Sequence, residues 1–327
     1  MKKVVVIKTD GNNKIGLGHI YRSLSLAKEL KKNNIKVIFL TESIILQKII
    51  PKSFQIEIIR NNTKDLKNIL NSLNPKIIII DKLKENTNVL EIFKKQSTVI
   101  AIDYTAKNKK MIKNGINILY QKSGVKGKNS FSGFNLVILS NYIKKIKPIK
   151  ISKKVKKIMI IQGGSDTMCN IPTIIDSLNQ IDTDIQLNVI IGGAFECWRK
   201  LEKSIENSIH KIKIHSNIKE IGKTMVKNDI AITGGGMTSL ELCNLGIPSI
   251  ILCGEEFENE TSSLLEKNGF GINLGYKKKI SKKEIALTVK KLMSNYQQRK
   301  NMNKIGKKLI DNEGIKRVTD IVLREDI

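Results

Sequence analysis

Residues 14–30 bring two glycines, a histidine and an arginine into the loop and helix that follow the first apolar run. The order G-L-G-H, from Gly16 to His19, ends where an amphipathic helix is predicted to begin. Free N–H groups and the positive end of the helix dipole favour an anion there. The same field keeps an imidazole neutral, so His19 could accept a proton. Spacing alone leaves open a histidine that only caps the helix or packs beneath the loop.

This loop does not match the dinucleotide-binding fingerprint. G-x-G-x-x-G would need a third glycine at position 21, which is Tyr21. The pattern therefore disfavours a nicotinamide enzyme. The loop is also longer than an ordinary strand-to-helix connection, which is typical of a functional segment.

A second glycine-rich stretch, G-G-S-D at 163–166, directly follows an apolar run. Two glycines, a small hydroxyl and an acid form a composition like that of a phosphate-binding loop, which makes Gly164 and Ser165 candidate ligand contacts. The alternative is a tight turn in which Ser165 or Asp166 caps the following helix.

A third stretch, D-I-A-I-T-G-G-G-M-T-S-L-E at 229–241, ends a predicted buried strand in three glycines. Glycines allow close backbone approach, and the following helix start can receive phosphate. A carboxylate one turn into that helix can accept hydrogen bonds from ribose hydroxyls. The predicted nucleotide-binding residues here are Gly235, Gly236, Thr238, Ser239 and Glu241. Farther along, Glu258 or Asn259 could reach a ligand, although for that segment taken alone a solvated helix start is the preferred interpretation.

The elements that must position these residues alternate in type along the chain. Short runs rich in β-branched residues predict buried parallel strands, and the amphipathic stretch 19–32 between the first two predicts a helix. The predicted strands are 3–8, 36–40, 55–59, 76–80, 98–102, 157–162, 186–191, 212–215, 229–233 and 248–253.

A lysine-rich segment with a proline, 144–157, interrupts this alternation and predicts a linker. We therefore expect an α/β protein with two Rossmann-like domains, 1–146 and 147–327, and a ligand cleft between them.

The formal charge of +28 raises the question of a nucleic-acid partner. The positive charge is almost entirely lysine, spread over the predicted helices, and aromatic residues make up only 5% of the chain. Readers of nucleic acid favour arginine and aromatic platforms, so this composition disfavours nucleic acid. The four cysteines show neither C-x-x-C spacing nor paired histidines, which predicts no disulfide framework and no zinc or other metal site.

No uninterrupted apolar stretch is long enough to span a membrane. The apolar run near the first residue is too short for a signal peptide, and Lys8 and Asp10 follow it at once. We expect a first strand there, a cytoplasmic protein and no membrane partner.

These motifs resemble those of the UDP-sugar hydrolases of pseudaminic acid biosynthesis and the related spore-coat polysaccharide proteins. The segment I-K-T-D-G-N-N-K-I-G-L-G-H-I-Y-R resembles the opening motif of that family, and the stretch from G-G-S-D through G-G-G-M-T-S-L-E is similar in order and spacing. More distantly, the second half resembles the peptidoglycan N-acetylglucosaminyltransferase, which has the glycosyltransferase-B architecture.

The resemblance implies a metal-independent and cofactor-free hydrolase that releases UDP from a 2,4-diacetamido-2,4,6-trideoxy sugar by water attack at the anomeric carbon. It implies that His19 is the general base and that Glu241 lies at the ribose. Asn259 would belong to the substrate site, and the backbone of 235–239 would hold the diphosphate. The predicted loop and substrate contacts of the first domain are Asp10, Gly16, Gly18 and Arg22.

The sequence departs from the family pattern on the sugar side. Leu83 stands where a tyrosine is usual, Tyr104 replaces the second residue of an Asp-Asp pair, and Glu260 replaces a glutamine. UDP is therefore a firmer expectation than the sugar. Two alternatives stay open: a glycosyltransferase that uses the same UDP site, and a non-catalytic nucleotide- or nucleic-acid-binding protein.

Overall fold

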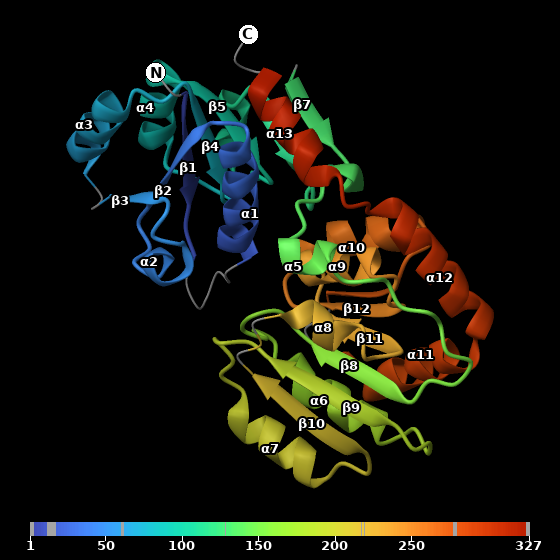
Figure 1. The fold of residues 1–327 in the computed structure, drawn as a ribbon. Coiled ribbons are helices and arrows are strands. Elements are labelled where there is room, and N and C mark those ends of the chain that lie inside the picture. The colour runs from blue at the N-terminus through green and yellow to red at the C-terminus, as the bar shows by residue number, and fades with distance from the viewer. Residues whose placement is uncertain are drawn as a thin grey trace. The chain divides into compact units, whose positions relative to one another are not determined.

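The computed structural model describes residues 3–11, 18–59, 62–127, 129–216, 218, 220–276 and 280–324. It divides into two compact units (Figure 1): the first is Met1–Ser140 with Asn312–Ile327, and the second is Asn141–Asp311. Each unit contains one parallel sheet and the helices that connect its strands. The predicted α/β class with two Rossmann-like domains is confirmed.

The described part of the first unit contains a sheet of seven strands in the order β3-β2-β1-β4-β5-β6-β7. Every strand pairs with its neighbours in parallel. The order reverses between β1 and β4, and ligands of such sheets bind at the carboxyl ends of the strands at this switch point. The strands are β1 Val4–Thr9, β2 Lys36–Thr41, β3 Gln55–Ile58, β4 Ile77–Asp81, β5 Thr98–Ile102, β6 Asn114–Asn117 and β7 Asn129–Ser132.

The first unit's helices bury one apolar stripe each. In α1, Ile20, Leu24, Ala27 and Leu30 are all buried, as the 3.6-residue spacing predicts. The helices and short 3₁₀ turns of this unit are α1 Gly18–Lys32, α2 Leu46–Ile49, α3 Thr63–Leu73, α4 Thr87–Gln96, η1 Lys107–Met111, η2 Phe134–Leu136 and α13 Gly314–Arg324.

The second unit repeats the plan with a described sheet of six strands in the order β10-β9-β8-β11-β12-β13. Its switch point lies between β8 and β11. The strands are β8 Lys157–Ile161, β9 Gln186–Ile191, β10 Lys211–Ser216, β11 Ile230–Thr233, β12 Ser249–Cys253 and β13 Ile272–Tyr276. The helices are α5 Asn141–Lys144, α6 Asn170–Leu178, α7 Trp198–Glu206, α8 Ile221–Met225, α9 Met237–Asn244, α10 Glu258–Lys267, α11 Lys282–Ser294 and α12 Tyr296–Leu309.

Three strands lie where the sequence predicts none: β6, β7 and β13. The sequences of the first two are N-G-I-N and N-S-F-S. Because most of their residues are polar, they lack the apolar run that predicts the other strands. β13 contains Gly275 at a positive φ of 74° and pairs with β12 through a register shift. Pairing with an existing sheet edge forms these strands in spite of their composition.

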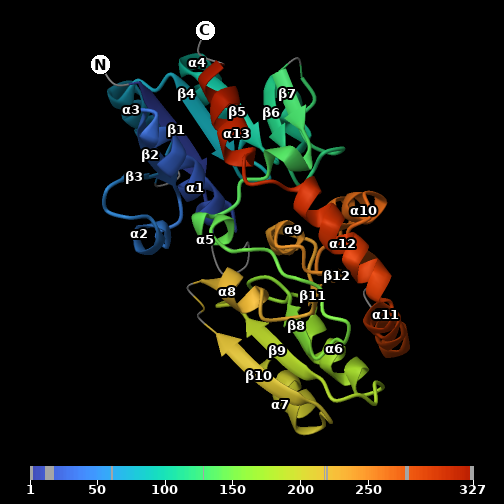
Figure 2. The ribbon, with the colours of Figure 1, turned by 45° about the vertical axis from the view of Figure 1, so that its right-hand side comes forward.

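The division of the chain differs from the expected one. The first stretch of the second unit begins at Asn141, before the predicted boundary, and the last helix returns to the first unit. There α13 packs on α1 and η2 (Figure 2). A Cβ added at Gly314 would lie 2.2 Å from the Val137 carbonyl oxygen, so only glycine lets the helix start this close. The expectation that the second domain runs to residue 327 is therefore corrected.

The cysteine expectation is also corrected, because Cys169 and Cys197 form a disulfide with a Cα–Cα separation of 5.8 Å. The two residues are 28 apart in sequence, and each precedes a helix that follows one of the adjacent strands β8 and β9. Sheet topology, rather than a local spacing motif, brings them together. Separately, no helix in the described ranges is long and apolar enough to cross a membrane.

The buried side chain of Arg299 links the first segment of the second unit to its last helices through hydrogen bonds. Its guanidinium donates to the carbonyl oxygens of Leu292 and Met293 in α11 and to those of Ser152 and Lys153 in the incoming segment. Only 1% of this side chain is exposed, and burial lowers its pKa. The planar fork of arginine can serve all four carbonyl oxygens at once.

We predict that Arg299→Lys lowers the free energy of unfolding by about 2 kcal/mol, because an ammonium group cannot reach both pairs of carbonyl oxygens. Urea denaturation of the variant checks this. Lys300→Arg, the reverse exchange at the exposed neighbouring residue, is the control and should leave stability unchanged. Equal stability of the two variants would contradict the role assigned to Arg299.

Candidate functional site

Arg22 is a buried cation that lies where strands β4 and β5 of the first unit end. Its guanidinium pairs with Asp81 through two nitrogens and with Asp103 through a third. Asp81 ends β4, and Asp103 directly follows β5. All three side chains are nearly inaccessible to solvent. The two carboxylates outweigh the effect of burial and raise the pKa of Arg22, which stays charged.

Asp103 also binds the segment that follows β6. Its second carboxylate oxygen accepts the backbone N–H groups of Ile118, Leu119 and Tyr120 at 2.7, 2.8 and 3.3 Å. It has a positive φ of 51°, a strained conformation for a residue other than glycine. Arg22 thus joins α1, β4 and the β5–β6 edge. These bonds give Arg22 a structural role at this edge, and its contact with a substrate stays a prediction.

His19 lies three residues before Arg22, in the first turn of α1. The imidazole is partly buried, and the structure gives it no hydrogen-bond partner within the described residues. Burial lowers its pKa; Asp81 opposes this effect, Arg22 adds to it, and Asp103 opposes it. The direction agrees with the neutral imidazole expected for a base. Gly18 is exposed at the helix start, and Gly16 lies outside the described residues.

Asp10 is the hub of a second charged group at the switch point, where β1, β2 and β4 end. One of its oxygens accepts the Thr41 hydroxyl and the Glu42 N–H at 2.9 and 2.7 Å. The other accepts Lys8 and Lys82, both at 2.7 Å. Burial by itself would raise the pKa of Asp10, but the two lysines outweigh it and hold the pKa well below its usual range. With both oxygens accepting protein donors, Asp10 orders this edge, and its contact with a ligand stays a prediction.

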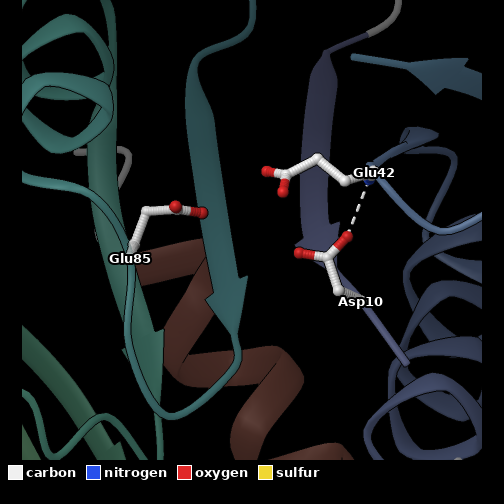
Figure 3. A group of neighbouring side chains, drawn as sticks. All are labelled: Asp10, Glu42 and Glu85. Atoms are coloured by element: carbon white, nitrogen blue, oxygen red, sulfur yellow. Dashed lines mark hydrogen bonds between the residues drawn. The ribbon is translucent and has the colours of Figure 1, made fainter. Parts of the chain in front are cut away.

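Asp10, Glu42 and Glu85 point toward a common region (Figure 3), and their carboxylate oxygens are close enough to one another to hold a metal ion. Two ammonium groups already lie among them. The fully buried Lys8 contacts Glu42 at 2.9 Å, and Lys82 contacts Glu85 at 3.1 Å. The two lysines neutralise most of the negative charge of the three carboxylates, so we describe these five side chains as an ion network.

In the second unit, two glycine-rich loops follow the strands that flank the switch point. The G-G-S-D loop follows β8, and the G-G-G loop follows β11, which pairs with β8. A Cβ at Gly163 or Gly164 would meet no heavy atom within 4 Å. These two glycines therefore border open space, and Gly163 has a positive φ of 68°.

The acid of the G-G-S-D loop is used within the protein. The carboxylate of Asp166 accepts the N–H groups of Asn170 and Ile171 at 2.7 and 2.9 Å, in the first turn of α6. This is the capping alternative that the sequence left open. Burial raises the pKa of Asp166, and the two N–H bonds oppose that effect. Gly164 is exposed and Ser165 partly exposed, so both stay candidates for ligand contact.

The three glycines after β11 do not all serve the same purpose. A Cβ at Gly235 would lie 2.5 Å from the Ser262 hydroxyl and 2.8 Å from the Glu258 Cβ. Gly235 is thus needed for the approach of α10. Its N–H donates to the Glu258 carboxylate at 3.1 Å, and Ser239 donates its N–H and hydroxyl to the Gly236 carbonyl oxygen.

The start of α9 still offers donors. The first N–H groups of a helix have no acceptor within it. For those of Met237 and Thr238, the described residues supply no acceptor either. Ser239 is fully buried, whereas Thr238 and Gly236 are partly exposed. Within 235–239, the N–H groups of Gly235 and Ser239 already have acceptors, and anion binding by the rest of this backbone stays a prediction.

Glu241 and Asn259 have different surroundings. Burial raises the pKa of Glu241 to about 7. Asn259 is exposed in the first turn of α10, and its carbonyl oxygen accepts the Asn273 amide at 3.0 Å. Its role in a sugar site stays a prediction.

The sequence missed the partners of the charged groups. Asp81 and Asp103 each directly follow a predicted strand, and this position, together with the family pattern at Asp103, is the signal that could have marked them. Lys8 is a charged residue inside an apolar strand, and the sequence pattern shows only that it interrupts the apolar run. Glu258 gave no signal that linked it to a loop 23 residues earlier.

The relatives agree with the resemblance seen in the sequence. No protein-family model matches the chain. It is 32% identical over 285 residues to an uncharacterized protein of Methanocaldococcus jannaschii, covering 78% of this chain and 57% of that protein. It is 24% identical over 332 residues to the spore coat polysaccharide biosynthesis protein SpsG of Bacillus subtilis, covering 97% of both chains.

Among solved structures, MurG of Acinetobacter baumannii superposes with a TM-score of 0.73 at 12% identity, over 99% of this chain and all of MurG. The chain is a relative of SpsG with the glycosyltransferase-B fold. A UDP-GlcNAc 2-epimerase of Neisseria meningitidis, bound to UDP-GlcNAc, shares the fold with a TM-score of 0.65 at 13% identity, over 99% and 100% of the two chains. At these identities, the glycosyltransferase-B likeness concerns the fold alone.

We predict that Arg22→Met lowers the free energy of unfolding by about 3–5 kcal/mol, because it leaves Asp81 and Asp103 buried without a cation. Urea denaturation measures the loss, and Lys32→Met at an exposed position of the same helix is the control. A variant of normal stability that had lost only ligand affinity would instead favour a substrate-binding Arg22.

We predict that Glu241→Gln stabilises the fold increasingly as the pH rises. A carboxyl whose pKa is raised on folding, here from 4.5 to about 7, binds its proton more tightly in the folded chain. Its stabilising effect is complete below pH 4.5 and is lost as the pH rises through about 7.

The variant lacks this loss, so its advantage over the natural chain should reach about 3 kcal/mol at pH 8 and vanish at pH 4. Urea denaturation across that range provides the measurement. Glu256→Gln, at an exposed position, should show no such trend. A constant difference at all pH values would disprove the burial of Glu241 as its cause.

Proposed function

We propose that the protein is a hydrolase that releases UDP from a UDP-linked amino sugar. The observation that supports this most directly is the pair of glycine-rich loops after β8 and β11, at the switch point of the second unit's sheet. The names of two proteins with similar folds or sequences point the same way: the epimerase was solved with UDP-GlcNAc, and SpsG is named for polysaccharide biosynthesis.

In this proposal the second unit holds the nucleotide. Gly164 and Ser165 border the open side of the first loop, and the N–H groups of Met237 and Thr238 supply donors at the start of α9. Such donors stabilise the charge that grows on the diphosphate as it leaves. Glu241 would accept hydrogen bonds from the ribose hydroxyls once it is ionised.

The first unit supplies the base. His19, neutral because its pKa is lowered, takes a proton from water as the oxygen attacks C1 of the sugar. The bond between C1 and the diphosphate oxygen breaks, and UDP leaves with the bonding electrons. Arg22 acts by holding Asp81 and Asp103, whose charges partly oppose the lowering of the His19 pKa by burial.

The sugar proposed is a 2,4-diacetamido-2,4,6-trideoxyhexose or a similar amino sugar of surface polysaccharide or nonulosonic acid biosynthesis. Lys82 and Leu83 follow β4 at the first unit's switch point, and Leu83 stands where the family resemblance predicts a tyrosine. Asp10 and Glu85 outweigh the effect of burial and raise the pKa of Lys82 to about 12, so its ammonium group stays charged. A different side chain at this edge would change which sugar substituents are accepted.

The deciding experiment is incubation of the protein with UDP-linked amino sugars alone, with free UDP and free sugar followed by NMR. Hydrolysis predicts that both appear in equal amounts without any acceptor. A glycosyltransferase would release little UDP until an acceptor is added. A non-catalytic nucleotide-binding protein would release none under either condition.

We predict that His19→Ala lowers turnover about 10²–10⁴-fold, the usual contribution of a positioned general base. Its affinity for UDP should stay nearly unchanged, because the nucleotide contacts belong to the second unit. Turnover by NMR and UDP binding by calorimetry separate the two effects. Tyr21→Phe, at an exposed residue of the same helix turn, is the control. Full turnover in the alanine variant would remove His19 from the mechanism.

A further inference from the structure

The carboxylate of Glu258 lies within the loops that the proposed function assigns to phosphate. One of its oxygens accepts the N–H of Gly235 at 3.1 Å and the N–H of Gly254 at 2.8 Å. Gly235 belongs to the loop after β11, and Gly254 directly follows β12. A single carboxylate therefore bridges the ends of two adjacent strands.

The glycines around it show how closely this carboxylate fits. A Cβ at Gly236 would lie 3.3 Å from one Glu258 oxygen, and Cβ atoms at Gly234 and Gly254 would lie 3.7 and 3.8 Å from the other. The absence of side chains at these positions leaves room for an anion beside the backbone. In this structure the protein's own carboxylate lies there.

A buried donor without an acceptor lies beside the same loop. The side-chain nitrogen of Gln162 has no hydrogen-bond partner among the described residues, and Gln162 is only 7% exposed. Its amide oxygen would lie 3.7 Å from a Cβ at Gly234. A buried amide N–H without an acceptor is costly, and a phosphate oxygen would supply that acceptor.

No salt bridge to Glu258 occurs within the described ranges. Burial raises its pKa, and the N–H groups of Gly254 and Gly235 oppose this effect. The carboxylate is therefore held by backbone donors, which are also the groups that bind phosphate at glycine-rich loops.

We propose that Glu258 is a resident anion of the glycine loop, which occupies the Gly235 and Gly254 N–H groups until the diphosphate of the ligand displaces it. This inference rests on the proposed nucleotide site. It assigns Glu258 a competing role: its carboxylate weakens the binding of any phosphate that must share these donors or lie beside them. Displacement leaves Gly235 N–H and the Gln162 amide for the ligand.

The test is calorimetric titration of the natural chain and of Glu258→Gln with UDP, uridine and inorganic pyrophosphate. Removing the charge should lower the Kd for UDP about ten-fold, because like charges in one site repel strongly. Pyrophosphate should show a similar gain, whereas uridine, which lacks phosphate, should show none. Glu256→Gln, an exposed acid two residues earlier, should behave like the natural chain.

A second variant, Glu258→Ala, removes the competing oxygen altogether and should gain at least as much affinity. Thermal melting curves confirm that each variant is folded. An unchanged or higher Kd for UDP in both variants would overturn the resident anion and make Glu258 a support for the loop. An equal gain for uridine would overturn it as well.

The same titrations separate this inference from the proposed function. UDP binding by the natural chain without a gain in the variants would reject the resident anion alone. A gain for pyrophosphate, with no UDP binding by any variant, would reject the UDP site and keep the resident anion. If no variant binds either ligand, both are rejected.

Discussion

The buried guanidinium of Arg22 connects α1 to the ends of β4 and β5 in the first unit. A charge removed from water must be paired, and Arg22 satisfies this requirement with the carboxylates of Asp81 and Asp103. Asp103 in turn holds three backbone N–H groups after β6. One ion cluster therefore fixes the start of α1 against the ends of two strands, and His19 lies in that same helix turn.

In the second unit, backbone N–H groups rather than a cation pair with two carboxylates. Asp166 accepts two N–H groups at the start of α6, and Glu258 accepts two from the glycines that follow β11 and β12. Asp166 stabilises the first turn of α6 and is part of the fold. Glu258 lies between glycines instead, where a close anion is possible only because the side chains are absent. The same chemistry thus serves folding at one loop and competes with a ligand at the other.

Several motif residues owe their type to packing. Gly235 is required by α10, and Gly314 by the return of the last helix to the first unit. Asp10 and Arg22, both predicted to contact a ligand, are hydrogen-bonded to protein partners. Motif matching could not separate these uses, because a residue that orders a site edge and one that touches the ligand occupy neighbouring positions in the same loop.

The sequence by itself determined the α/β class, the helix that opens at His19 and most of the buried strands, since these follow from local apolar periodicity. It also marked the glycine-rich loops, because glycine and helix-start signals are local. Only the tertiary structure decided the pairing of Arg22 with two distant acids, the disulfide between Cys169 and Cys197, the placement of α13 and the contact of Glu258 with Gly235. The placement of α13 depends on packing against α1 and η2. The other three depend on which strand ends become neighbours, and strand order is a property of the sheet that no local pattern encodes.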